Sequence, residues 1–142
     1  MDKNTNKMLN TKGGIKLLLS DEKDKEAISV KSPKELTIIL ADEKEIISLT
    51  DKNGDNVLTI DSKNGAITLT AKQKIVLKAG NCELTLDGQG GSFGIKGDKV
   101  EISGNQTVDI KANQTTTVKA NQNVEVNGGA QTVVKGGIIQ IN

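Results

Sequence analysis

The sequence predicts an all-β protein of short strands, whose fold closes only when several copies of the chain associate. Two observations carry this prediction. Pairs of apolar residues recur at positions i and i+2 along most of the 142 residues, and towards the C-terminus they recur every eight residues. The apolar side chains are almost all Ile, Leu and Val, which favour strands, and Phe93 is the single aromatic residue.

Composition argues against several functional classes. The chain has 19 basic and 18 acidic residues, a balance that does not attract nucleic acid or anionic membranes, and it lacks base-stacking aromatics. No apolar run approaches the ~18 residues of a membrane span, and the N-terminus has no signal-peptide centre. With Cys82 as its only cysteine, the chain has no intrachain disulfide. We therefore expect synthesis in the bacterial cytoplasm, no nucleic-acid partner and no cofactor.

The strongest signal is an eight-residue repeat that starts at Lys99. Five blocks follow one another: KVEISGNQ, TVDIKANQ, TTTVKANQ, NVEVNGGA and QTVVKGGI. Each block carries an apolar or β-branched pair at the same two places, for example Val100 and Ile102 or Val108 and Ile110. Three of the blocks end in Gly or Ala followed by Asn-Gln, which suits a turn. The repeat predicts one short strand per block.

Upstream, the same pairs continue with looser spacing. They are Leu17/Leu19, Ile28/Val30, Ile38/Leu40, Ile47/Leu49, Leu58/Ile60, Ile67/Leu69, Ile75/Leu77, Leu84/Leu86 and Phe93/Ile95. Polar residues separate the members of most pairs, and Asn-Gly dipeptides at 53–54 and 64–65 predict tight turns. We therefore divide the chain into a flexible polar segment (1–12), an irregular β-prism with longer turns (13–98) and a regular octad β-helix with its tip (99–142).

The repeat also predicts how the fold closes. One chain folded as a meander would leave a long apolar stripe in water, which soluble proteins avoid. A single-chain β-helix would need coils of roughly 18 residues or more, which an eight-residue repeat fits poorly. If three chains each supply one strand per layer, the apolar faces meet on a common axis. The predicted fold is thus an intertwined homotrimeric triple-stranded β-helix, a three-sided prism.

These residues also suggest a family. The C-terminal octads resemble the triple-stranded β-helix of contractile-injection-system spikes, which are the VgrG-type proteins of type VI secretion, the central spike of contractile phage tails and related extracellular particles. Gly54–Ile60 and Gly65–Ala71 look like the strands that lead into that needle, and Lys135–Asn142 looks like its blunt tip. The resemblance covers residues 13 to 142 and implies the needle portion alone, without the family's usual N-terminal domain and, because His is absent, without its axial His-x-His metal site.

The resemblance implies a structural role: a spike that punctures membranes, carries a tip protein or cargo, and is delivered outward in a secreted or virion-like particle. The implied partners are two further copies, tube or baseplate components through a missing or separate N-terminal part, the target membrane and a PAAR-type tip protein. The residues expected to dock the tip protein are Gly136, Gly137, Ile138, Ile139, Gln140, Ile141 and Asn142. A trimeric adhesive or receptor-binding fibre shaft is the alternative, and a carbohydrate-active β-helix is a weaker one.

No catalytic activity is expected. Without His there is no Ser-His or Cys-His pair, so we interpret Cys82 as a structural thiol. The carboxylate pairs at 21–22 and 42–43 are interpreted as solvated turn residues. The segment 51–55 resembles the start of a calcium loop but lacks the closing Glu, and the glycines at 88–91 lack the context of a phosphate loop. No metal site is expected.

Overall fold

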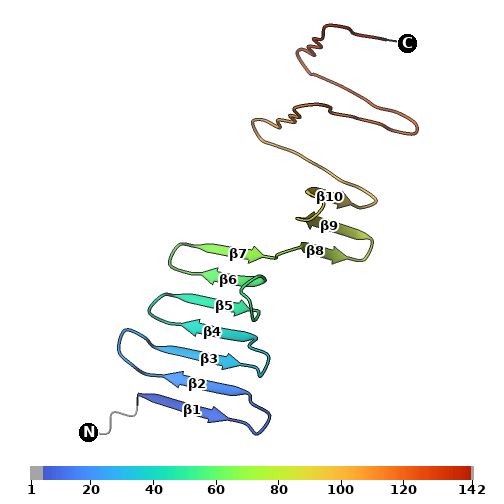
Figure 1. Cartoon of the computed structure of the whole chain (residues 1–142). Helices are drawn as coiled ribbons and strands as arrows, with labels where there is room; N and C mark the ends of the chain where they lie inside the picture. Colours follow the sequence, from blue (N-terminus) through green and yellow to red (C-terminus); the bar gives the residue numbers. More distant parts are fainter. Residues whose placement is uncertain (1–4, 142) are drawn as a thin grey trace. The chain divides into compact units, whose positions relative to one another are not determined.

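The computed structural model describes residues 5–141 and confirms an all-β fold, since every regular element among them is a strand. The chain divides into two units, the first ending at Val100 and the second beginning at Glu101. The first unit holds all the strands (Figure 1). They are β1 (Asn6–Asn10), β2 (Lys16–Ser20), β3 (Ala27–Lys31), β4 (Thr37–Ala41), β5 (Ile46–Thr50), β6 (Val57–Asp61), β7 (Ala66–Thr70), β8 (Lys74–Ala79), β9 (Cys82–Asp87) and β10 (Ser92–Lys96).

The strands form two antiparallel meanders. Strands β1 to β7 make a seven-stranded sheet in chain order, and β8 to β10 make a three-stranded sheet with β9 in the middle. Each sheet is open, so β1 and β7 leave free edges in the first and β8 and β10 in the second. At Lys72, between the two sheets, the backbone N–H donates to the Asn56 side chain (3.4 Å) and the ammonium pairs with Asp55 (2.8 Å).

The strand register brings the apolar pairs together. Ile38 and Leu40 lie opposite Val30 and Ile28 on β3, and opposite Leu49 and Ile47 on β5. The same pairing links every neighbouring pair of strands from β2 to β7 and from β8 to β10. Because alternate side chains of a strand point to opposite faces, each sheet collects its apolar pairs on a single face. We call these surfaces of the two sheets together the apolar face.

Tight turns set the register. Gly54 and Gly65 of the predicted Asn-Gly turns have φ of +73° and +64°, a conformation that glycine adopts without strain. At corresponding places in other turns, Asp24, Glu35 and Glu45 also have positive φ, of 64°, 66° and 53°. Positive φ costs an L-residue roughly 1–2 kcal/mol, so the rest of each of these three turns must offset this conformational cost.

Aspartates reinforce the two Asn-Gly turns and the turn between β9 and β10. Asp51 accepts hydrogen bonds from the Asn56 side chain (2.5 Å) and the Asp55 N–H (2.9 Å), and the first of these is the main reason that the pKa of Asp51 is lowered. The Asn64 side chain does the same for Asp61, whose pKa is also lowered. The Gly90 N–H donates to Asp87 (2.8 Å) and lowers its pKa.

The second unit has a different local structure. The backbone of residues 102–141 has no regular secondary structure and forms no hydrogen bond to another backbone group of the described chain. It bends at intervals of eight residues, at 105–106, 113–114, 121–122, 129–130 and 137–138, so the octad period is visible in the backbone. No strand is assigned in residues 102–141, so the strands expected there do not form a ladder within the described chain.

The N-terminal segment also differs from expectation. Residues 1–12 were expected to be flexible, yet Asn6–Asn10 forms β1, paired with β2 from Asn6 opposite Ser20 to Asn10 opposite Lys16. The turn between them closes through hydrogen bonds from the Gly14 N–H to the Thr11 carbonyl and from the Thr11 N–H to the Ile15 carbonyl, both 2.9 Å. Leu9 extends the apolar face because it lies opposite Leu17.

Candidate functional site

The apolar face is the most prominent feature of the first unit, because no described residue of that unit covers it. None of the described residues is buried, so the described chain has no hydrophobic core of its own. Ile28 on β3 is 44% exposed, Leu40 on β4 is 43% exposed and Ile67 on β7 is 76% exposed. A face of this composition is a candidate binding surface, since soluble proteins rarely leave a contiguous apolar patch of such extent in water.

In β3, β4 and β5 the residues of the opposite face are less exposed than those of the apolar face. On β3, Ala27, Ser29 and Lys31 are half-buried while Ile28 and Val30 are exposed, and β4 and β5 repeat the pattern. An antiparallel sheet with one packed face shows the reverse order, with apolar residues inside and polar residues outside. The inversion indicates that the described part of the first unit does not itself supply a packing partner for the apolar face.

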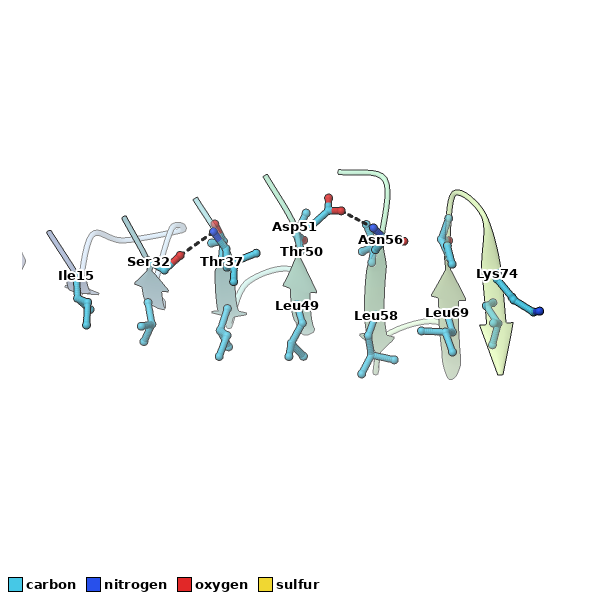
Figure 2. A pocket seen from close by; sticks show the side chains of 17 residues that line it. Ile15, Ser32, Thr37, Leu49, Thr50, Asp51, Asn56, Leu58, Leu69 and Lys74 are labelled. Carbon is cyan, nitrogen blue, oxygen red and sulfur yellow. Dashed lines mark hydrogen bonds between the residues drawn. The ribbon is translucent and has the colours of Figure 1, made fainter. Parts of the chain in front are cut away.

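A hollow of about 670 Å³ runs along the apolar face between β2 and β8. Figure 2 shows Leu49, Leu58 and Leu69 pointing to the same side of the sheet, from three neighbouring strands. Asp51 and Asn56 lie at one end of these strands, where they hydrogen-bond each other, and Lys74 marks the start of β8. The hollow is lined by aliphatic side chains with polar groups at its margin, so it suits an apolar partner better than a charged ligand.

The total exposed area gives the size of the missing contact. The chain exposes 12918 Å², whereas a folded monomer of 15.0 kDa exposes about 7,000 Å². The excess over that folded monomer is about 5,900 Å². A stable protein–protein interface covers about 800 Å² per partner, so the uncovered surface is sufficient for several such contacts.

In the second unit, unpaired backbone adds to this uncovered surface. Backbone N–H and C=O groups are almost always paired in folded proteins, with other backbone groups, side chains or water. The run 102–141 has no backbone partner in the described chain, and its apolar residues, such as Ile110 and Val126, are exposed. Extended backbone with alternating apolar side chains is a template for strand pairing with another chain.

The predicted tip residues lie at the end of this unit. The backbone bends at 137–138, and a Cβ at Gly136 would lie 3.3 Å from the Ile138 carbonyl oxygen, which favours glycine there. Ile138 and Ile141 are the most exposed of the large apolar residues, at 86% and 92%. Ile139 is exposed as well, while Asn142 lies outside the described residues.

The groups set aside during sequence analysis remain separate in the structure. No three His, Cys, Asp or Glu side chains among residues 5–141 come together as a metal site would require. The carboxylate of Asp51 is occupied by its own turn, and Glu22 pairs with Lys25 at 2.7 Å. Cys82 is exposed and free, and it lies on the same face of β9 as Leu84 and Leu86. The sequence did not predict that the apolar residues would be more exposed than their polar neighbours.

Comparison with known proteins finds no family model that matches the chain and no curated protein that matches it. No helix able to cross a membrane is found over residues 5–141. The functional argument therefore rests on the apolar face and the octad unit.

Proposed function

We propose that this chain is the needle module of a contractile injection system and works as an intertwined homotrimer, a triple-stranded β-helix. The observation that carries the proposal is the uncovered apolar face of the first unit. It extends across β2 to β7 and consists of Ile, Leu and Val at matched positions in register. A second copy of the same chain offers a surface of the same composition and the same strand spacing.

Three copies suit this face better than two. Two flat sheets packed face to face would bury the apolar residues but leave the lateral ends of both sheets open to solvent. Three sheets around an axis give each sheet two identical neighbours, and a cyclic arrangement closes without free lateral surfaces. Aliphatic side chains of moderate size suit the narrow axis of such a prism, which agrees with Phe93 being the only aromatic residue.

The second unit supports interchain strand pairing. In a triple-stranded β-helix the hydrogen-bond partners of each strand belong to the other two chains. A single chain would then be extended, would turn once per repeat and would form no ladder with itself. Residues 102–141 have the last two of these properties, since they bend every eight residues and form no ladder in the described chain.

The proposed work is mechanical. Three wrapped chains form a shaft that transmits the force of sheath contraction to a target membrane, and the shaft leaves the cell in a secreted or virion-like particle. Tube or baseplate components join it through an N-terminal part, and a PAAR-type protein docks on residues 136–142. The supporting features at that end are the exposed Ile138, Ile139 and Ile141, beside backbone that has no partner in the described chain. Unpaired strands at the end of a stack are templates for β-augmentation.

A trimeric adhesive or receptor-binding fibre shaft is the second candidate, because it uses the same architecture. Recognition heads of fibres rely on polar and aromatic contact residues. The sequence holds a single aromatic residue, Phe93, and the exposed large side chains of residues 138–141 are aliphatic. This favours a shaft that receives an apolar cap.

The test compares three forms of the protein: the full chain, a chain lacking residues 138–142, and a Lys135→Ala control that keeps the tip. A PAAR-type cap from the same locus is expected to bind the full chain and the control equally and not to bind the shortened chain. All three forms are expected to keep the same oligomeric state. Unchanged cap binding to the shortened chain would show that residues 138–142 are not needed to dock the cap, and the proposed docking site would be wrong. Binding of the full chain to cell surfaces, without any cap binding, would favour the fibre.

A further inference from the structure

The turns of the seven-stranded sheet lie in two rows. Because the strands alternate in direction, successive turns fall on opposite sides of the sheet, as Figure 1 shows. One side holds the turns 11–15, 32–36 and 51–56, which we call the lysine turn row. The other side holds the turns 21–26, 42–45 and 62–65, and we call the first two the acidic turn row, since 62–65 carries Lys63 and no carboxylate. The two rows flank the apolar face.

The two rows differ in charge. In the acidic turn row, carboxylates outnumber ammonium groups. The carboxylates are Asp21, Glu22, Asp24, Glu26, Asp42, Glu43 and Glu45, and the ammonium groups are Lys23, Lys25 and Lys44. The described structure pairs only one of these carboxylates with a lysine, Glu22 with Lys25 at 2.7 Å. This row therefore retains a negative excess after its internal ion pair is formed.

The lysine turn row has the opposite character because its ammonium groups outnumber its carboxylates. Glu35 pairs with Lys31 (3.2 Å) and Asp55 with Lys72 (2.8 Å), so both carboxylates have their cations. The Asp51 carboxylate keeps its charge, because its partners within the turn are neutral N–H groups. With Lys31 and Lys72 the row still holds five ammonium groups (Lys12, Lys31, Lys34, Lys52 and Lys72) against three carboxylates (Glu35, Asp51 and Asp55). Each turn keeps one exposed lysine, Lys12, Lys34 or Lys52, and none of the three has an ion pair in the described chain.

We infer that a second copy of this chain covers the apolar face with its lysine turn row set against the acidic turn row of the first copy. The inference rests on the proposed trimer and adds the contact that orients its subunits. In a cyclic trimer with all sheets facing the axis, one side of each sheet meets the opposite side of the next, so the contact is heterologous and closes after three copies.

The levels of the turns agree with this contact. Successive strands are ~4.8 Å apart, and the two rows are offset from each other by one strand. Around an axis parallel to the stack, Lys34 of one copy lies at a level between the turns 21–26 and 42–45 of its neighbour. Lys12 lies one strand before the first of these turns and Lys52 one strand after the second. Each lysine turn thus lies next to an acidic turn.

Such contacts specify orientation more than they add affinity. Exposed ion pairs are individually weak, whereas like charges placed face to face suppress a wrong arrangement. The apolar face alone would also accept a second copy turned end for end or shifted by two strands. Matching the two turn rows favours parallel subunits in register.

Charge reversal in the full-length chain tests the inference. The lysine-reversed chain carries Lys12→Glu, Lys34→Glu and Lys52→Glu, and its partner variant carries Asp21→Lys, Asp42→Lys and Glu43→Lys. A third chain combines all six changes. The matched control carries Lys23→Glu, Lys44→Glu and Lys63→Glu, which changes net charge as much as the lysine-reversed chain does but lies on the acidic side. Assembly is followed by light scattering as a function of concentration, in low salt and in 1 M NaCl.

Reversal of either row alone is expected to raise the concentration for half-assembly about tenfold in low salt. The chain with all six changes is expected to return this concentration to the parent value. The control should assemble as well as the parent chain, and 1 M NaCl should remove most of the difference, since the screening length is then about 3 Å. If the control and the lysine-reversed chain are weakened equally, or if the six-change chain is not restored, the inference is wrong while the trimer stands. A parent chain that stays monomeric refutes both.

Zero-length carbodiimide cross-linking gives an independent readout. The two rows lie at opposite ends of five-residue strands, about 16 Å apart in one sheet, so a bond between them must join different chains. Mixed isotope-labelled and unlabelled chains are expected to give interchain cross-links from Lys34 to residues 21–26 or 42–45. Cross-links of Lys34 only within the lysine turn row would contradict the inference.

Discussion

Leu49 on β5 offers the sharpest test of which face of the sheet is covered on assembly. Its side chain lies on the apolar face, where Leu49 is opposite Ile38 on β4 and opposite Leu58 on β6. The residue before it, Ser48, points to the other face and lies opposite Thr59. Replacing each by Ala, one at a time, changes two adjacent positions of the same strand that face opposite sides.

The size of the effect follows from exposure. Leu49 is 43% exposed in the single chain, so association can bury at most this fraction of its surface. Complete burial of a Leu side chain is worth about 1.5–3 kcal/mol, so this part contributes about 0.6–1.3 kcal/mol per chain and about 2–4 kcal/mol per trimer. Leu49→Ala is therefore expected to raise the concentration for half-assembly about 5- to 30-fold, since the trimer constant depends on the square of that concentration.

Sedimentation velocity over a dilution series measures this concentration directly. Ser48→Ala is expected to leave it within about twofold of the parent value, because a surface change of this kind is nearly neutral. If Leu49→Ala and Ser48→Ala have equal effects, or if Ser48→Ala has the larger one, the apolar face is not the surface that becomes covered.

Three further predictions concern turns, acid stability and the cysteine. Glu45→Gly should raise the free energy of unfolding by about 1 kcal/mol in urea titrations, because Glu45 has φ of 53°; a decrease would show that its backbone is not strained. The lowered pKa values of Asp51, Asp61 and Asp87 stabilise the fold above the unfolded pKa of about 3.9, and this contribution is lost as pH falls through the lower folded values. Acid titration by circular dichroism should therefore show little change from pH 7 to 4.5 and a loss below, and a transition near neutral pH would contradict the assignment. Cys82 should react slowly with a thiol reagent in the assembly, whereas Thr85→Cys in a Cys82→Ser background, on the other face of β9, should react fast; equal rates would argue against burial of the apolar face.

Much of the first unit is predictable from residue spacing. Each apolar pair from Leu17/Leu19 to Phe93/Ile95 lies in its own strand, because period-two alternation is a local property of the chain. The Asn-Gly turns at Gly54 and Gly65 have the expected positive φ. The positive φ of Glu35 and Glu45 had no local signal, since these residues do not favour it, and the register of the neighbouring strands imposes it.

Two features needed more than local pattern. Strand β1 contains polar residues at both ends, and it forms because β2 offers a free edge beside Met8 and Leu9. The octads of the second unit predicted strands, but the pairing of a strand depends on a partner, and the described chain offers none to residues 102–141. The repeat period determines where the backbone turns, whereas it does not define the partner with which each strand would pair.

The molar mass of the purified protein tests the central claim most directly. Light scattering during size-exclusion chromatography at micromolar concentration should give about 45 kDa, three times the 15.0 kDa of one chain. A mass of one chain under these conditions would mean that the apolar face stays uncovered, and the proposed trimer would be wrong.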